Sequence, residues 1–160
     1  HDLGRDRGEG VIAMNDLGEI RQRREALVGA AAAFEAALAA PASDLRWTES
    51  LGNALVTLRA TIDEHVTATE APGGTVDQLR DRAPRLSNQI DRLVDQHAEM
   101  TADAERLLER LEHAPAERTP DDTAAIREQA LELLGTIVRH RQLGADLLYE
   151  AYDVDLGGPG

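Results

Sequence analysis

The sequence has 160 residues, of which 42% are hydrophobic and 2% aromatic, and its formal net charge is −13. A core with so few aromatic side chains has to be built from Leu, Ile, Val and Ala, which favours packed helices over sheets. The negative charge argues against free nucleic acid and anionic membranes as partners. The sequence has no cysteine, which excludes disulfides and thiolate metal ligands.

The sequence gives no sign of a membrane or export segment. No apolar run approaches the roughly 18 residues that a membrane-spanning helix needs, and the N-terminus has no signal-peptide pattern. We therefore expect a cytoplasmic protein. A chain of 160 residues fits a single domain with a core of its own.

Apolar residues recur at three- and four-residue steps over four long segments, as is typical of amphipathic helices. The segment 1–16 comes before this periodicity, and we interpret it as a disordered N-terminal arm; we interpret 156–160 as a flexible tail. The remaining residues, 17–155, are predicted to form one domain. Its expected helices cover residues 17–40, 45–70, 75–112 and 120–151.

Turn and capping residues separate these helices. The run Ala-Pro-Gly-Gly over residues 71–74 ends the second helix, and Thr75 with Gln78 has the pattern of a capping box. Pro84 either restarts or kinks the third helix. Thr119 followed by Pro120 begins the fourth. Four long helices with short links predict an all-α, up-down-up-down antiparallel four-helix bundle.

Three of these helices each carry one histidine in the apolar stripe. His65 follows Leu58 and Ile62 at helical spacing, and His97 and His140 occupy the same kind of position in the third and fourth helices. At a rise of about 1.5 Å per residue, the three lie roughly 30, 22 and 30 Å from the same end of the bundle. We therefore expect three inward imidazoles in one layer.

Such a layer has two interpretations. Imidazole binds iron, zinc and copper, so the three rings could share a metal ion. A buried histidine can also be a structural residue that is hydrogen-bonded to a neighbour. Both interpretations stay open at this point.

The histidines and the turn after the second helix resemble those of the hemerythrin-like (HHE cation-binding) proteins, in a divergent actinobacterial-type branch. The resemblance is carried by His65, Glu70 with the following Ala-Pro-Gly-Gly turn, His97, and the segment 140–147. It implies an antiparallel four-helix bundle that holds non-haem iron, often as a di-iron pair. It further implies dioxygen binding, iron storage or sensing, or a response to oxidants or nitric oxide.

The chain departs from the ligand pattern of that family. The first helix has no histidine. Thr69 and Thr101 stand four positions after His65 and His97, and Ala145 stands five positions after His140, where the family has further ligands. The missing ligands would have to be carboxylates. A ferritin-like site is a poorer match, because no histidine follows a glutamate at the Glu-x-x-His spacing.

Two carboxylates are candidates to complete the site, so the predicted metal ligands are His65, Glu70, His97, His140 and Glu35. Glu70 is otherwise a solvated acid at the end of its helix. Glu35 interrupts the Ala-rich apolar run of the first helix, and it could instead accept a hydrogen bond from the indole of Trp47.

Two functional hypotheses follow. The first is a metal-binding bundle, holding iron or di-iron with zinc as an alternative, which acts with dioxygen or nitric oxide in sensing or iron handling. The second is a metal-free interaction module with structural histidines. Neither hypothesis includes nucleic acid or membrane as a partner, and a homodimer is left open. We assign no catalytic or cofactor-binding residues, because the sequence has no nucleophile with an attendant base and no phosphate loop.

Overall fold

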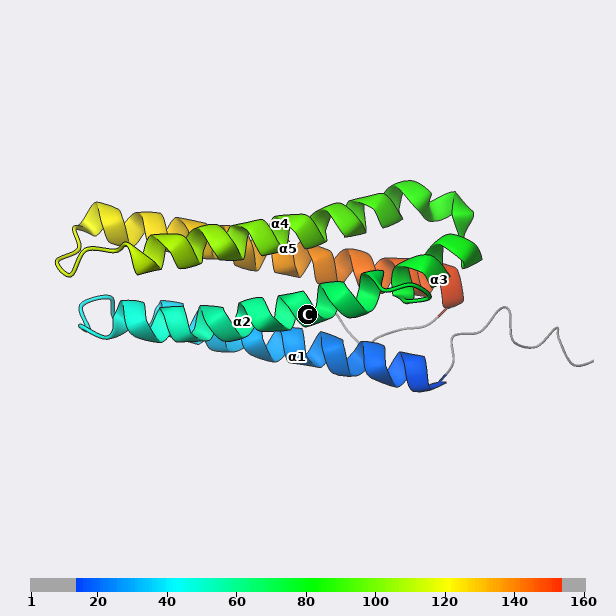
Figure 1. The fold of residues 1–160 in the computed structure, drawn as a ribbon, viewed down its shortest axis with the longest axis horizontal. Coiled ribbons are helices and arrows are strands. Elements are labelled where there is room, and N and C mark those ends of the chain that lie inside the picture. The colour runs from blue at the N-terminus through cyan, green and yellow to red at the C-terminus, as the bar shows by residue number, and fades with distance from the viewer. Residues whose placement is uncertain (1–13, 154–160) are drawn as a thin grey trace, which may run out of the picture.

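The structure is a computed structural model that describes residues 14–153, and Figure 1 shows it as a bundle of long helices. Residues 1–13 of the predicted arm and the whole predicted tail, 156–160, lie outside the described residues, whereas residues 14–16, which were predicted as part of the arm, belong to the first helix. The first helix begins three residues earlier than expected. The helices are α1 (Met14–Ala39), α2 (Trp47–Glu70), α3 (Thr75–Arg82), the 3₁₀ helix η1 (Pro84–Leu86), α4 (Ser87–Glu112) and α5 (Pro120–Tyr152).

The four long helices α1, α2, α4 and α5 form the bundle. The links from α1 to α2 and from α4 to α5 lie at one end of it, and α3 with η1 closes the other end between α2 and α4 (Figure 1). The described residues contain no strand. The predicted all-α antiparallel four-helix bundle is therefore confirmed.

The link between α2 and α4 differs in detail from the sequence prediction. The capping box of Thr75 and Gln78 does not form, because the N-cap of α3 is Gly74 and no side chain caps it. Instead, the backbone N–H of Gly73 donates to Asp77 Oδ2 over 2.9 Å. Pro84 restarts the chain in η1 rather than kinking one continuous helix.

Two glycines make this link possible. Gly73 has φ of 75°, in the left-handed region that side chains rarely adopt. A Cβ on Gly74 would lie 2.7 to 2.9 Å from three backbone carbonyl oxygens, those of Ala68, Thr69 and Ala71. The last turn of α2, which ends at Glu70, is therefore tightly held against the link.

The other predicted cap is confirmed. Thr119 and Asp122 form a reciprocal capping box, in which the Asp122 N–H donates to Thr119 Oγ1 and the Thr119 N–H donates to Asp122 Oδ2. Pro120 occupies the first turn of α5, where its missing N–H has no intrahelical partner to lose.

The buried apolar residues form two separate clusters along the bundle. The larger cluster fills the end near the two short links, and the smaller cluster fills the end closed by α3. The larger cluster comprises Leu27, Ala31, Phe34, Leu38, Trp47, Leu51, Leu55, Leu58, Ile62, Met100, Ala104, Leu107, Ile126, Ala130, Leu133 and Ile137. The smaller cluster comprises Val76, Leu79, Ala83, Leu86, Ile90, Leu93, Leu147, Leu148 and Ala151.

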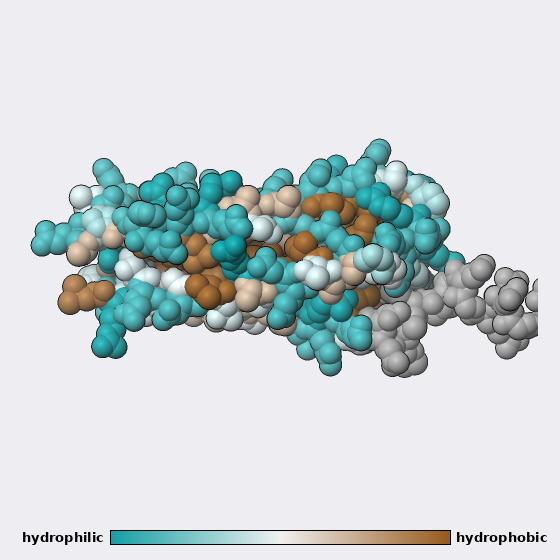
Figure 2. Space-filling model, in the orientation of Figure 1, coloured by the Kyte–Doolittle hydropathy of each residue, from teal (hydrophilic) through white to brown (hydrophobic). Residues whose placement is uncertain are grey.

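The three histidines lie along the helices between these clusters. His65 follows Ile62 of the larger cluster, while His97 and His140 each come between a residue of one cluster and a residue of the other. We call His65, His97 and His140 the histidine layer. The face in Figure 2 is largely hydrophilic, and hydrophobic residues gather along the middle of the molecule on it.

Candidate metal centre

Three helices bring the histidine layer together. His65 lies on α2, His97 on α4 and His140 on α5, each on the face that the apolar periodicity turns inward. His97 is 1% exposed and His140 is 3% exposed, while His65 is half-buried. The predicted inward orientation of the three rings is confirmed.

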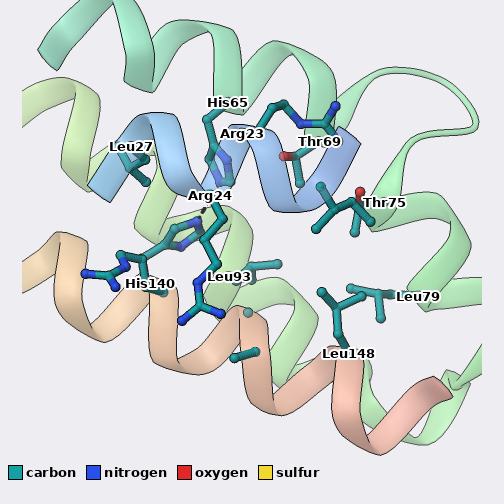
Figure 3. Close-up of a pocket in the computed structure, with 14 residues that line it drawn as sticks. Arg23, Arg24, Leu27, His65, Thr69, Thr75, Leu79, Leu93, His140 and Leu148 are labelled. Atoms are coloured by element: carbon teal, nitrogen blue, oxygen red, sulfur yellow. Dashed lines mark hydrogen bonds between the residues drawn. The ribbon is translucent and has the colours of Figure 1, made fainter. Parts of the chain in front are cut away.

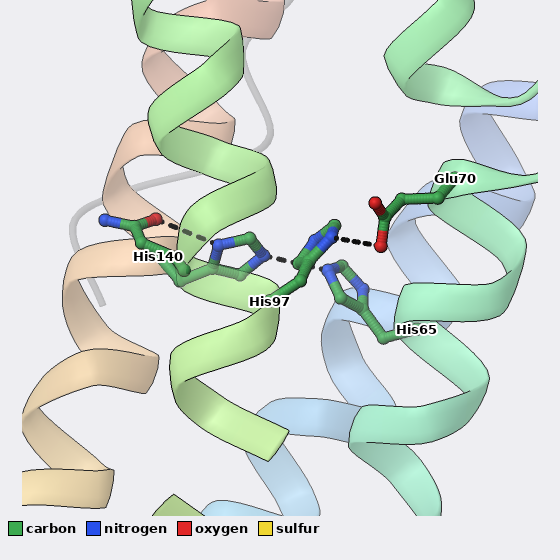
Figure 4. Close-up of polar contacts among 5 residues, drawn as sticks. His65, Glu70, His97 and His140 are labelled. Carbon is green, nitrogen blue, oxygen red and sulfur yellow. Dashed lines mark hydrogen bonds and ion pairs between the residues drawn. The ribbon is translucent and has the colours of Figure 1, made fainter. Parts of the chain in front are cut away.

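The rings are in mutual contact (Figure 4). Their centroids are 5.2 Å apart for His65 and His97, 5.1 Å for His65 and His140, and 4.6 Å for His97 and His140. One ring nitrogen of each histidine lies within 4.8 Å of the corresponding atoms of the other two. Two tetrahedral ligand nitrogens on one zinc ion are about 3.3 Å apart, so small side-chain shifts would bring three nitrogens to one metal ion.

Two further side chains hold the rings in orientation. His97 Nδ1 lies 3.2 Å from Glu70 Oε2, and His140 Nδ1 lies 3.0 Å from Gln96 Oε1. Carboxylate and amide oxygens only accept, so both Nδ1 atoms carry the proton and donate it. The Nε2 atoms of His97 and His140 then carry lone pairs, which is the state that a metal ligand requires.

His65 takes the opposite tautomer in this arrangement. Its Nε2 lies 2.9 Å from His140 Nε2, and because the latter carries a lone pair, His65 Nε2 is the donor. His65 Nδ1 is then unprotonated. Transfer of the proton to Nδ1 would free His65 Nε2 for a metal ion without any change in charge.

Two of the six ring nitrogens have no hydrogen-bond partner in the described part of the chain. They are His65 Nδ1 and His97 Nε2, and both are buried. A buried nitrogen without a partner costs about 1–3 kcal/mol. The lone pair on His97 Nε2 is therefore available to a bound ion, while His65 Nδ1 would take up the proton displaced from His65 Nε2.

The environment keeps all three rings neutral. Desolvation by burial lowers the pKa of His65 to about 4, and repulsion from His97 in its protonated form and from Arg23 adds to the shift. Desolvation likewise lowers the pKa of His97 to about 4. Desolvation, with His97 and His65 alongside, lowers the pKa of His140 to about 2. The His97 contact with Glu70 is thus a hydrogen bond to a carboxylate rather than an ion pair at neutral pH.

The two carboxylates predicted for the site take different places. Glu70 is beside His97, but its Oε2 accepts the hydrogen bond from the ring, so it orients a ligand in this structure (Figure 4). Glu35 is exposed and lies in a groove beside Val138 and Arg139. It follows the inward Phe34 by one residue, about 100° around the helix, so it points away from the layer.

Glu35 also does not accept a hydrogen bond from Trp47. The indole Nε1 is buried and has no hydrogen-bond partner within the described residues. The guanidinium groups of Arg118 and Arg127 lie over the ring instead, 5.4 and 5.5 Å from its centroid. These are cation–π contacts, which the sequence analysis did not foresee.

Sequence reasoning also missed Gln96. It precedes His97 on α4, yet its amide oxygen reaches the histidine of α5 rather than its own neighbour in sequence. The signal available in the sequence was a glutamine directly before an inward histidine, on a helix flank that otherwise carries charged residues. Its partner depended on how α4 and α5 pack.

Comparison with known proteins adds nothing to this geometry. No protein-family model matches the chain, and no curated protein or solved structure matches it at a significant level. No helix in the described part of the chain is long and apolar enough to cross a membrane. The fold and site define an all-α helical bundle with a buried three-histidine cluster that could hold a metal ion.

Proposed function

We propose that this protein is a metal-binding helical bundle in which His65, His97 and His140 hold one transition-metal ion. The observation that carries the proposal is the set of three neutral, mutually contacting imidazoles, with two buried nitrogens that no described residue satisfies. A bound ion would take three lone pairs, while the Nδ1–H groups of His97 and His140 keep donating to Glu70 and Gln96.

The donor set supports a single metal ion better than a di-iron pair. Paired iron ions in helical bundles rely on several carboxylates, whereas Glu70 is engaged with His97 and Glu35 is exposed. Three imidazoles suit iron, zinc and copper alike. We propose iron as the metal, with zinc as the alternative.

Three protein ligands leave a coordination position for an exogenous molecule. The resemblance to hemerythrin-like proteins suggests dioxygen or nitric oxide as that molecule, and hence a role in sensing or in iron handling. The chain's own contribution is to hold His97 and His140 in the Nδ1-protonated tautomer and to orient both rings through Glu70 and Gln96.

The proposal is tested by metal content and by metal-dependent stability. Protein purified without a polyhistidine tag should contain close to one metal ion per chain, measured by elemental analysis. Thermal unfolding should shift upward with Fe(II) or Zn(II) relative to chelator. At an ion concentration one hundred times the dissociation constant the expected stabilisation is about 2.7 kcal/mol, which corresponds to roughly 5–10 °C.

His97→Ala should abolish that shift, because it removes one of three ligands. His113→Ala is the matched control, since His113 is exposed at the C-cap of α4 and outside the layer. Loss of the shift in both variants, or in neither, would contradict a shared site.

The metal-free interaction module remains the second candidate. It is favoured by the four ring nitrogens that already have partners in the protein. Equal unfolding midpoints with metal and with chelator in the unmodified protein would exclude the metal site and leave this alternative.

A further inference from the structure

The packing between α1 and α5 is the loosest among the neighbouring long helices of the bundle. Beside the histidine layer the two helices line a cavity of about 70 Å³ (Figure 3). Nearer the end with the short links they border an apolar groove, which is lined by Val28, Ala32, Leu131, Leu134 and Val138 among others. We call the outer surface of α1 and α5 around this groove the α1/α5 face.

Helix α5 exposes large apolar side chains along this face. Leu131 is 61% exposed, Val138 58% and Tyr149 57%. Their spacings of 7 and 11 residues each return to within about 20° of the same side of a helix, so the three form one stripe. They are three of the five large hydrophobic residues that the described chain exposes. Apolar exposure concentrated in this way marks an interaction surface.

Helix α1 lacks the charged solvent face of an ordinary surface helix over much of its length. Residues 26–40 contain one charged side chain, Glu35, although 29% of the whole chain is charged. All other exposed residues of this stretch are Ala or Gly. A helix that is apolar all round is normally buried. Small side chains such as Gly29, Ala32 and Ala36 let a further helix approach closely.

We propose that the α1/α5 face is the interface of a homodimer, in which α1 of each protomer packs antiparallel against α5 of the other. A two-fold axis parallel to the helices places each α1 over the partner's α5, so that the same contact forms twice. The large side chains of α5 then lie against the small side chains of α1. A two-fold axis perpendicular to the helices would instead place α5 on α5, large against large.

The charges of the face favour the same arrangement. Glu35 of α1 and Arg139 of α5 are both exposed and line the groove. Within residues 14–153 Glu35 has no ion-pair partner, and Arg139 donates to Thr136 of its own helix. Packing of α1 on the partner's α5 brings Glu35 toward the partner's Arg139, and the reverse pair forms by symmetry. A perpendicular axis at the level of the groove would place like charges together.

A second copy of this chain is therefore the occupant that suits the face in size and charge. At −13 per chain, two copies repel one another in general. The 26–40 stretch, with its single charge, is a place where that repulsion is weak. Helix α1 has 26 residues and is about 39 Å long, and two helices are about 20 Å wide, so the face covers about 800 Å² per protomer. That area equals the roughly 800 Å² per partner of a stable interface of standard size.

The dimer is tested by sedimentation equilibrium of the full chain in chelator, at about 1 to 100 μM. We expect reversible association to twice the chain mass of 17.3 kDa, with a dissociation constant in the micromolar range or below. A monomer at every concentration would overturn the proposal. It would leave the face to a terminal segment of the same chain or to a different protein.

Val138→Glu should raise the dissociation constant of the dimer about tenfold or more, because it buries a charge against an uncharged stretch of the partner. Val56→Glu is the matched control, since Val56 is also 58% exposed but lies on α2, outside the face. It should leave the dissociation constant unchanged, and circular dichroism should show both variants folded. Equal weakening by both substitutions, or by neither, would contradict the assigned surface.

A charge exchange tests which helices meet. Glu35→Arg and Arg139→Glu should each weaken the dimer several-fold, and the double variant, with the net charge of the unmodified protein, should recover most of the loss. Additive weakening in the double variant would contradict packing of α1 on the partner's α5.

The dimer and the proposed metal site are independent, because His65, His97 and His140 do not line the groove. His97→Gln should therefore lose metal binding and keep the dissociation constant of the dimer. Loss of the dimer in this variant would show that the interface depends on the histidine layer, which contradicts the proposal.

Discussion

The larger apolar cluster and the histidine layer are both buried within the same bundle, but different interactions hold them. In the cluster, each fully buried leucine contributes about 1.5–3 kcal/mol through removal from water, with little demand on orientation. In the layer, burial is tolerated because Gln96, Glu70 and a ring-to-ring hydrogen bond satisfy four nitrogens. The comparison indicates that the cluster stabilises the fold, whereas the layer maintains a defined protonation state.

Acidification should give the largest difference between the two regions, because the histidine layer titrates and the larger cluster does not. The folded-state pKa values are about 4 for His65 and His97 and about 2 for His140, against 6.5 ordinarily. Below pH 6.5 the unfolded chain binds protons that the folded chain does not, so stability falls as the pH drops from 6.5 to about 4. Each such proton lowers the free energy of unfolding by about 1.4 kcal/mol per pH unit.

Urea unfolding of the metal-free protein between pH 7.5 and 4.5 measures this dependence. His97→Gln should show a shallower decline, because it removes one of the protons concerned. His113→Gln, at an exposed position, should leave the decline unchanged. Parallel curves of unfolding free energy against pH for the unmodified protein, His97→Gln and His113→Gln would contradict neutral burial of the layer.

Truncation within the larger cluster should give the next largest effect. Leu58→Ala removes a fully buried side chain and should lower the free energy of unfolding by about 2–5 kcal/mol. The loss should be the same with metal and with chelator, and the same at pH 7.5 and 6, because no titrating group is removed. A loss that depends on metal would show that the cluster and the layer are not separable.

Gly74→Ala should have an intermediate effect on stability. A Cβ there meets three carbonyl oxygens of the α2 terminus at less than 3.0 Å, so the backbone has to move, at about 1–3 kcal/mol. Because Glu70 ends α2, the shift should also weaken metal binding. Gly52→Ala is the control, since a Cβ at that position meets no atom within 4 Å. Calorimetry and metal titration of both variants provide the measurement.

Glu70→Gln should change stability least and metal binding markedly. The amide can still accept from His97 Nδ1, so the free energy of unfolding without metal should change by less than about 1 kcal/mol. Loss of the negative charge behind the ligand should weaken metal affinity about 10–100-fold. Glu64→Gln, at an exposed position one residue before His65, controls for charge alone in the same titration.

The fold was predictable from the sequence because its signals are local. The helical periodicity, the Ala-Pro-Gly-Gly run and the Thr119 cap each act within a few residues, and each predicted the correct element. The expected level of the histidines followed from helix rise alone, and the ring contacts agree with it. The split of the third predicted helix into α3, η1 and α4 was not determined by the sequence, since a proline such as Pro84 can either kink a helix or interrupt it.

The side chains around the histidine layer were harder to predict from the sequence. Helix periodicity fixes the direction of a Cβ but not the reach of a long side chain. Gln96 and Arg24 lie on flanks that the pattern indicates as solvent-facing, yet Gln96 contacts His140 and Arg24 lines a cavity that His65 and His140 also line. Glu70 was identified as a candidate, while its contact with His97 depends on the packing of α2 against α4.

The hydrogen bond between His65 and His140 has a consequence for how an ion would be held. In zinc fingers the ion is an integral part of the folded state, and the domain unfolds without it. Here protein groups alone hold the three rings: His65 Nε2 and His140 Nε2 lie 2.9 Å apart, and Gln96 and Glu70 accept from His140 and His97. If the layer binds an ion as proposed, the protein should release it to a competing chelator with its helices intact, as expected of an exchangeable carrier rather than a permanently metallated scaffold.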